Sequence, residues 1–125
     1  MVLSANINTI TDLFLGGWDI NDLTGIEDFA ALEELSCEMQ QLTSLDLSQN
    51  TLLTFLSCRY NQLTNLDMSQ NTALYSLTCH SNQLTNFNVS QNTTLDYLHC
   101  FGNQLTSLDV SQNTALTQLH CFGYR

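Results

Sequence analysis

Apolar residues along the chain fall on a spacing that repeats. From residue 32 onward the order is Leu-x-x-Leu-x-Cys-x-x-Asn-Gln-Leu-Thr-x-Leu-Asp-x-Ser-Gln-Asn-Thr-x, with small departures in each copy. Copies begin at Leu32, Leu53, Leu74, Leu95 and Leu116. A related pattern over residues 10–31 is one residue longer. The chain is therefore built from one short unit used again and again.

Each unit contains two extended segments. In the first, alternation puts Leu56 and Cys58 inside and Ser57 outside, which is the period of a strand. In the second, the same alternation turns Asp67 outward on the opposite side. Helix is disfavoured there because Thr, Asp, Ser and Asn dominate. Stacked units predict a concave parallel β-sheet of about six short strands. The convex side should contain short strands, extended segments and turns.

A period of 21 residues with leucines at fixed offsets is the signature of a leucine-rich repeat solenoid. The unit resembles the 21-residue repeats of Bacteroidetes-type bacteria, the IRREKO-like class. Residues 20–29 look like the internalin-type repeat of 22 residues that often precedes them. The resemblance covers residues 10–125 and implies a bacterial adhesion or recognition module, extracellular or on the cell surface. The chain departs from the class in its incomplete N-terminal cap and in lacking a C-terminal cap.

These boundaries predict a single leucine-rich repeat domain over residues 1–125. Residues 1–9 form a partial N-terminal cap, residues 10–31 an internalin-like repeat and residues 32–125 the 21-residue repeats, the last one truncated. No secretion signal is recognisable at the start, because no charged segment precedes an apolar one.

Two buried columns are expected to hold the coils together. Asparagines follow the first strand of each unit, where a buried amide can close the corner by donating to one coil and accepting from another. This ladder comprises Asn61, Asn82 and Asn103, with Trp18 and Gln40 at one end and Tyr124 at the other. The second column comprises Cys37, Cys58, Cys79, Cys100 and Cys121. In-register side chains on parallel strands point the same way, so we interpret these cysteines as unpaired apolar core residues.

The charge of −10, with Arg59 and Arg125 as the only Lys or Arg residues, argues against nucleic acid and anionic membranes as partners. No apolar run reaches the length of a membrane span. Proline is absent and glycine is scarce, so side chains of the Ser-Gln-Asn-Thr corner are expected to bond their own backbone.

Catalysis is not expected. Three Cys–His neighbours occur, but adjacent residues in a strand point to opposite faces, so the histidine cannot activate the thiol. No cofactor and no metal are predicted. Two weaker alternatives stay open, which are calcium on the convex column of Asp46, Asp67, Asn88 and Asp109, and a transition metal at the three histidines. The plainer interpretation of the convex column is hydrogen bonding to nearby turn N–H groups and threonine hydroxyls.

The outward positions of the predicted concave face vary between copies, whereas the rest of the unit hardly changes. Aromatic residues gather there, as they do in interfaces. The predicted ligand-binding residues are Phe55, Arg59, Tyr60, Tyr75, His80, Tyr97, His99, Phe101, His120 and Phe122. A protein or peptide is the expected ligand, and a glycan is the alternative for the same surface.

Two further functions are compatible with the repeat. Regular threonine columns, such as Thr43, Thr64, Thr85 and Thr106, can order water as ice-binding solenoids do. A purely structural spacer is the other. At the C-terminal end, we expect Leu116, Leu119 and Cys121 to face solvent, with Tyr124 as a partial shield, and a second copy to cover this end in a homodimer.

Overall fold

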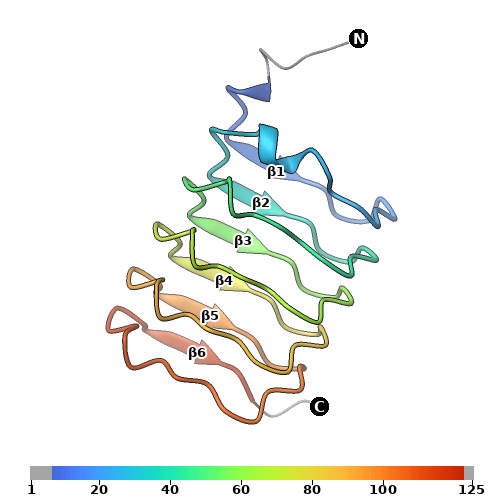
Figure 1. Ribbon diagram of the computed structural model, residues 1–125. Coiled ribbons are helices and arrows are strands. Elements are labelled where there is room, and N and C mark those ends of the chain that lie inside the picture. Colours follow the sequence, from blue (N-terminus) through green and yellow to red (C-terminus); the bar gives the residue numbers. More distant parts are fainter. Residues whose placement is uncertain (1–6, 123–125) are drawn as a thin grey trace.

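The computed structural model describes residues 7–122, which form a leucine-rich repeat solenoid with one parallel sheet of six strands. The strands are β1 (Asp12–Phe14), β2 (Glu34–Ser36), β3 (Phe55–Ser57), β4 (Ser76–Thr78), β5 (Tyr97–His99) and β6 (Gln118–His120). They lie in sequence order, so each coil adds one strand beside the last (Figure 1). The predicted fold class is confirmed.

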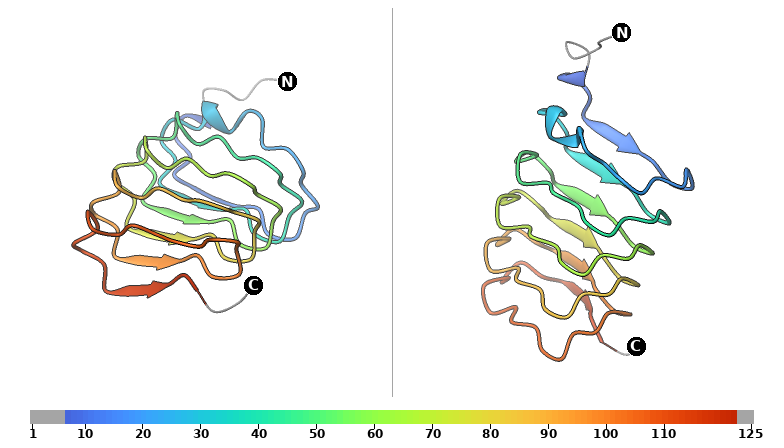
Figure 2. Two further views of the ribbon diagram at one scale, coloured as in Figure 1. Left: turned by 60° about the horizontal axis from the view of Figure 1, so that its bottom comes forward. Right: turned by 45° about the vertical axis from the view of Figure 1, so that its right-hand side comes forward.

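The return side of each coil runs opposite the strands and contains turns and extended backbone (Figure 2). One short 3₁₀ helix, η1 (Ile26–Asp28), lies there in the described part of the chain. In the second coil, Asp46 Oδ1 accepts hydrogen bonds from the Ser48 N–H at 3.0 Å and the Ser48 hydroxyl at 2.7 Å. We expected threonine hydroxyls as partners of this column, but Asp46 is bonded by Ser48, and a threonine takes this place beside Asp22 of the first coil. The reason is local: a serine stands two residues after the acid in the later coils.

The core is a set of identical residues in register. Leu35 pairs with Leu56, Leu56 with Leu77 and Leu77 with Leu98. These leucines are fully buried, and burial of each contributes about 1.5–3 kcal/mol. Each coil therefore covers the apolar face of its neighbours.

Each asparagine after a strand joins its own coil to the preceding one. Asn82 Nδ2 donates to the carbonyls of Cys58 at 3.0 Å and Cys79 at 3.1 Å, and its Oδ1 accepts from the Leu63 N–H at 3.0 Å. Asn61 and Asn103 repeat this arrangement. No polar group of these amides is left without a partner.

The first coil closes its corner differently. The Gln40 amide accepts from the Ile20 N–H at 2.8 Å and donates to the Leu15 carbonyl. Trp18, which we expected in the same column, is instead 73% exposed. That expectation was wrong, because Trp18 lies on the surface and the Gln40 side chain alone makes the hydrogen bonds that close this corner.

A second buried ladder was not predicted. It consists of Asn50, Asn71, Asn92 and Asn113. Asn71 Nδ2 donates to the carbonyls of Leu47 at 3.0 Å and Asn50 at 2.9 Å. The expectation that these corner side chains bond their own backbone was wrong for asparagine, which faces the preceding coil. In all four, Oδ1 accepts no hydrogen bond from the described residues.

The cysteine column contains one disulfide, between Cys100 and Cys121, whose Cα atoms are 4.3 Å apart. Our interpretation of all five cysteines as unpaired was wrong for this pair, because the two backbones approach closely enough for a bond. Cys121 is also buried rather than solvent-facing, since it is bonded to the coil behind it. Cys37, Cys58 and Cys79 are free thiols in the core.

The two ends of the sheet are less covered than its middle. Leu119 is 42% exposed, as expected for the last strand, and Leu116 is half-buried. The cap expected over residues 1–9 falls partly, and the Tyr124 shield wholly, outside the described residues. Between residues 7 and 122, no helix has the length and apolar character of a membrane span.

Candidate binding face

A groove of about 310 Å³ crosses the strands on the concave face, which is the outer surface of the sheet. Its floor is a row of small residues, Ser36, Ser57 and Thr78, which are neighbours in the strand register. The same row continues to Phe14 on β1 and His99 on β5, which close the two ends. The groove thus runs along the solenoid axis, perpendicular to the strands.

Larger side chains form the two walls of the groove. Phe55 and Tyr97 stand on one side, two residues before the floor row in each strand, with the small Ser76 between them. Glu38, Arg59 and His80 are on the other side. Alternation along each strand explains this layout, because every second residue points outward.

The Glu38–Arg59 ion pair, at 2.8 Å from Nε to Oε2, is the only salt bridge between residues 7 and 122. Ser57 also donates its hydroxyl to Glu38 Oε2 at 2.9 Å. The hydrogen bond from Arg59 is the main reason that the pKa of Glu38 lies below its usual value. The wall is therefore fixed in place, and Arg59, the sole Lys or Arg in this part of the chain, is neutralised.

His80 lies within an aromatic stack rather than in solvent. Its ring stacks on Phe101 with centroids 4.3 Å apart and meets the edge of Tyr60 at 5.1 Å. Its Nδ1 lies 3.0 Å from the Ser81 hydroxyl. We expected an exposed histidine, but rings from the coils on both sides cover it and leave 5% exposed. This burial lowers the pKa of His80.

A second stack joins β5 and β6. The His99 ring lies between Tyr97, with centroids 4.1 Å apart, and His120, at 4.4 Å. The Tyr97 hydroxyl is 3.1 Å from His99 Nδ1, and His99 Nε2 is buried without a hydrogen-bond partner in the described chain. Burial, followed by the charge of His120, lowers the pKa of His99.

The structure brings part of the predicted set together. Phe55, Arg59, His80, Tyr97 and His99 line the groove. Phe101, His120 and Phe122 line an adjoining hollow of about 710 Å³ with Leu119 at the C-terminal coil, and His99 lines both. Tyr60 is an exposed neighbour of His80, while Tyr75 is exposed outside both hollows.

Several groove residues were missing from the predicted set. Phe14 is the clearest, since it is 61% exposed and ends the groove. Its signal was the alternation of Leu13, Phe14 and Leu15 in the first unit, which is the same pattern as in later strands. The small floor residues gave no signal because serine and threonine also occur throughout the turns.

Tyr60 marks a turn as well as an outward position. Met39, Tyr60, Ser81 and Gly102 occupy one repeat position and all have positive φ, from 57° to 69°. Side chains other than glycine are strained in this region. The turn therefore sets the direction of Tyr60 beside the groove, at some cost in stability.

The Cys–His neighbours do not form catalytic pairs. Burial raises the pKa of the Cys79 thiol to about 12, so a thiolate is strongly disfavoured at neutral pH. The histidine of this pair is on the other face of the sheet. The imidazoles of His99 and His120 stack face to face, so their ring nitrogens do not converge on a common point. No metal-holding group of three His, Cys, Asp or Glu side chains occurs among the described residues.

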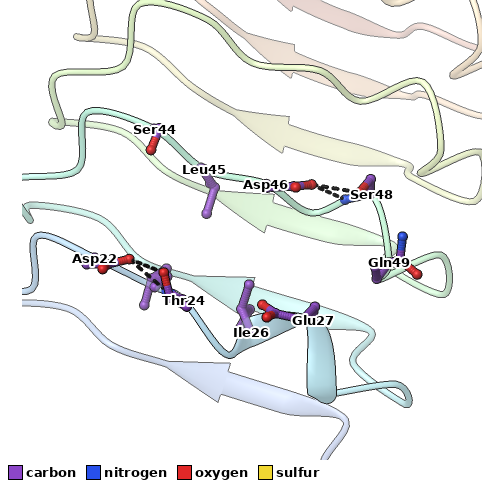
Figure 3. A pocket seen from close by; sticks show the side chains of 10 residues that line it. Asp22, Thr24, Ile26, Glu27, Ser44, Leu45, Asp46, Ser48 and Gln49 are labelled. Carbon is purple, nitrogen blue, oxygen red and sulfur yellow. Dashed lines mark hydrogen bonds between the residues drawn. The ribbon is translucent and has the colours of Figure 1, made fainter.

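A third hollow lies on the convex side, between the first two coils. It has a volume of about 350 Å³, and Asp22, Glu27 and Asp46 are among its lining residues. In Figure 3 the Asp22 and Asp46 carboxylates turn to Thr24 and Ser48, two residues on, rather than to a common centre. These hydrogen bonds lower the pKa of both aspartates. These aspartates therefore stabilise the turns in which they lie.

Comparisons with known proteins fit the fold. No protein-family model and no curated protein matches the chain. The functional domain of InlJ from Listeria monocytogenes, described as including a cysteine ladder, is 48% identical with a TM-score of 0.93. An internalin C2 of the same species is 25% identical with a TM-score of 0.82. A leucine-rich repeat protein of Leptospira interrogans, at 23% identity and a TM-score of 0.66, is similar in fold alone.

The chain corresponds to only part of each of these proteins. The match covers 94% of this chain but 26% of the InlJ structure, and 99% of this chain but 56% of internalin C2. The structural neighbours are thus internalin-type and other bacterial leucine-rich repeat proteins. The assignment to the IRREKO-like class stays a prediction.

Proposed function

We propose that the chain is a non-catalytic recognition module that binds a protein or peptide along its concave face. The observation that carries the proposal is the groove of about 310 Å³, which crosses several strands and has aromatic walls. Aromatic side chains in a preformed hollow are the usual anchors of protein interfaces. The similarity to internalin-type proteins supports the same function.

The setting we propose is extracellular or on the cell surface. The Cys100–Cys121 disulfide supports this, because such bonds persist in oxidising compartments. A glycan remains the alternative ligand, since the exposed Tyr60 and Tyr75 rings suit stacking on sugars.

A random linear peptide display library, selected on the immobilised protein, tests the proposal. Tyr97→Ala combined with Phe101→Ala should abolish binding of the selected peptides, because one wall loses the Tyr97 ring and the other loses the Phe101 ring that stacks on His80. Gln83→Ala combined with Gln104→Ala, at exposed positions away from the sheet, should bind like the wild type. Circular dichroism and urea midpoints check that each variant is folded.

Two results would contradict this function. Unchanged peptide binding by the Tyr97 and Phe101 variant would remove the concave face as the site. A library that yields no binder, together with glycan-array signals that the same variant loses, would replace the peptide by a sugar.

We also propose that a second copy covers the C-terminal coil. Leu119 and Phe122 expose apolar surface there, at 42% and 52%, and the acidic residues concentrate in the N-terminal half, away from this contact. Light scattering should give twice the chain mass, and Leu119→Glu should halve it. A wild-type monomer at high micromolar concentration would end this part of the proposal.

A further inference from the structure

Resting on the proposed function, the charges around the groove restrict what it accepts. Asp12 of β1 and Glu34 of β2 are direct neighbours in the strand register and both face outward. Neither has an ion-pair or side-chain hydrogen-bond partner among residues 7–122. Like charges opposite each other destabilise a sheet. The N-terminal end of the concave face thus carries uncompensated negative charge.

The chain has no cation of its own to place there. Arg59 is held by Glu38, and both lie on the far wall of the groove. The exposed Glu33 adds a further carboxylate beside Glu34. A cation supplied by a partner would remove the repulsion between Asp12 and Glu34, so charge complementarity favours a basic occupant.

The row of outward residues that begins with two carboxylates becomes largely aromatic further along the sheet. After Asp12 and Glu34 come Phe55, the small Ser76 and then Tyr97. Phe55 and Tyr97 both line the groove, so an apolar side chain bound between them would contact both rings above the buried Ser76. The point between the two rings lies two strands from Glu34, which is about 10 Å at the usual strand spacing.

The floor of the groove suits a polypeptide backbone. The hydroxyls of Ser36 and Thr78 bond no other group in the described part of the chain, so they are available to peptide N–H and C=O groups. An extended chain advances about 3.3 Å per residue, so 10 Å corresponds to three residues.

We propose that the groove binds an extended peptide segment with a Lys or Arg about three residues from an apolar side chain. The basic residue faces Asp12 and Glu34, and the apolar residue enters between Phe55 and Tyr97. The segment runs across the strands, along the solenoid axis.

Fluorescence anisotropy with peptides from the display selection tests this. The selected sequences should be enriched in Lys or Arg two to four residues from an apolar residue. Asp12→Asn combined with Glu34→Gln should raise Kd about tenfold, because two exposed ion pairs are lost. Phe55→Ala should weaken binding by a similar factor. Raising NaCl from about 50 to about 500 mM should weaken peptide binding by the wild type more than binding by the double variant.

Asp67→Asn is the matched control, since it removes one carboxylate on the convex side, where Asn88 already occupies the equivalent position. It should leave Kd unchanged. Binders that require Tyr97 and Phe101 but carry no basic residue would overturn this inference and leave the proposed function standing. An equal loss of affinity in Asp67→Asn and Glu34→Gln would also overturn it, because the effect would then be that of net charge.

Discussion

The interior of the solenoid and its concave face share one 21-residue period, but residues repeat in the interior and vary on the concave face. Inside, Leu56, Leu77 and Leu98 are identical neighbours in register and fully buried. One residue earlier on the same strands, the outward neighbours Phe55, Ser76 and Tyr97 all differ. The repeated interior thus fixes the backbone and leaves the outward positions open to variation.

The contacts of the two regions differ in the same way. Asn82 in the interior bonds backbone groups of its own coil and of the preceding coil, so its loss affects two coils at once. His80 on the concave face contacts mainly other side chains of that face, Tyr60 and Phe101. Interior changes should therefore reduce stability, while concave changes should mainly alter binding.

The largest effect is expected for Asn82→Ala. It leaves the Cys58 carbonyl and the Leu63 N–H without this side-chain partner, and each unsatisfied group costs about 1–3 kcal/mol. Urea unfolding should show a loss of about 3 kcal/mol or more. The exposed neighbour variant Gln83→Ala should stay within about 0.5 kcal/mol of the wild type. Equal midpoints for the two variants would disprove the structural role of the ladder.

The sequence predicts what depends on the period alone. Leu56 recurs at a fixed offset as an apolar residue and Asn82 as an amide. The strands and the ladder could therefore be predicted from the sequence. The burial of His80 was missed because it depends on rings two coils apart, Tyr60 and Phe101. The disulfide between Cys100 and Cys121 was missed because in-register side chains on parallel strands were expected to stay apart, whereas these two cysteines are bonded at a Cα separation of 4.3 Å.

The second ladder and the positive-φ turn had signals that sequence reasoning did not use. Asn71 recurs at every corner as strictly as Asn82 does, which a merely local turn residue need not do. Gly102 and Gly123 stand at the same offset in successive copies, which indicates a turn suited to glycine. A repeat position that holds glycine twice is better interpreted as backbone geometry than as part of a binding surface.

A smaller effect is expected at the positive-φ turn, where two substitutions should change stability in opposite directions. Gly102→Ala should cost about 1–2 kcal/mol, because φ is +69° and a Cβ there would lie 3.1 Å from the Ser81 nitrogen. Met39→Gly, at φ +57° on an exposed residue, should instead gain about 0.5 kcal/mol, since relief of strain exceeds the entropy of glycine. Thermal or urea unfolding measures both. Destabilisation by both changes would mean that the turn is not strained in Met39.

The smallest expected effect is a pH dependence of stability, which comes from histidines of the concave face and not from the interior. Burial is the main cause of the lowered pKa of both His80 and His99 on the concave face, and Arg59 and His120 act in the same direction while Glu38 opposes it at His80. The folded chain then binds fewer protons than the unfolded one, so stability is full above the unfolded value of about 6.5 and falls as pH drops through it. Urea midpoints between about pH 7.5 and 5.5, above the range where carboxylates titrate, should show this decline. His80→Phe keeps a ring against Phe101 but cannot titrate, so its decline should be shallower, and a slope equal to that of the wild type would show that His80 does not carry the effect.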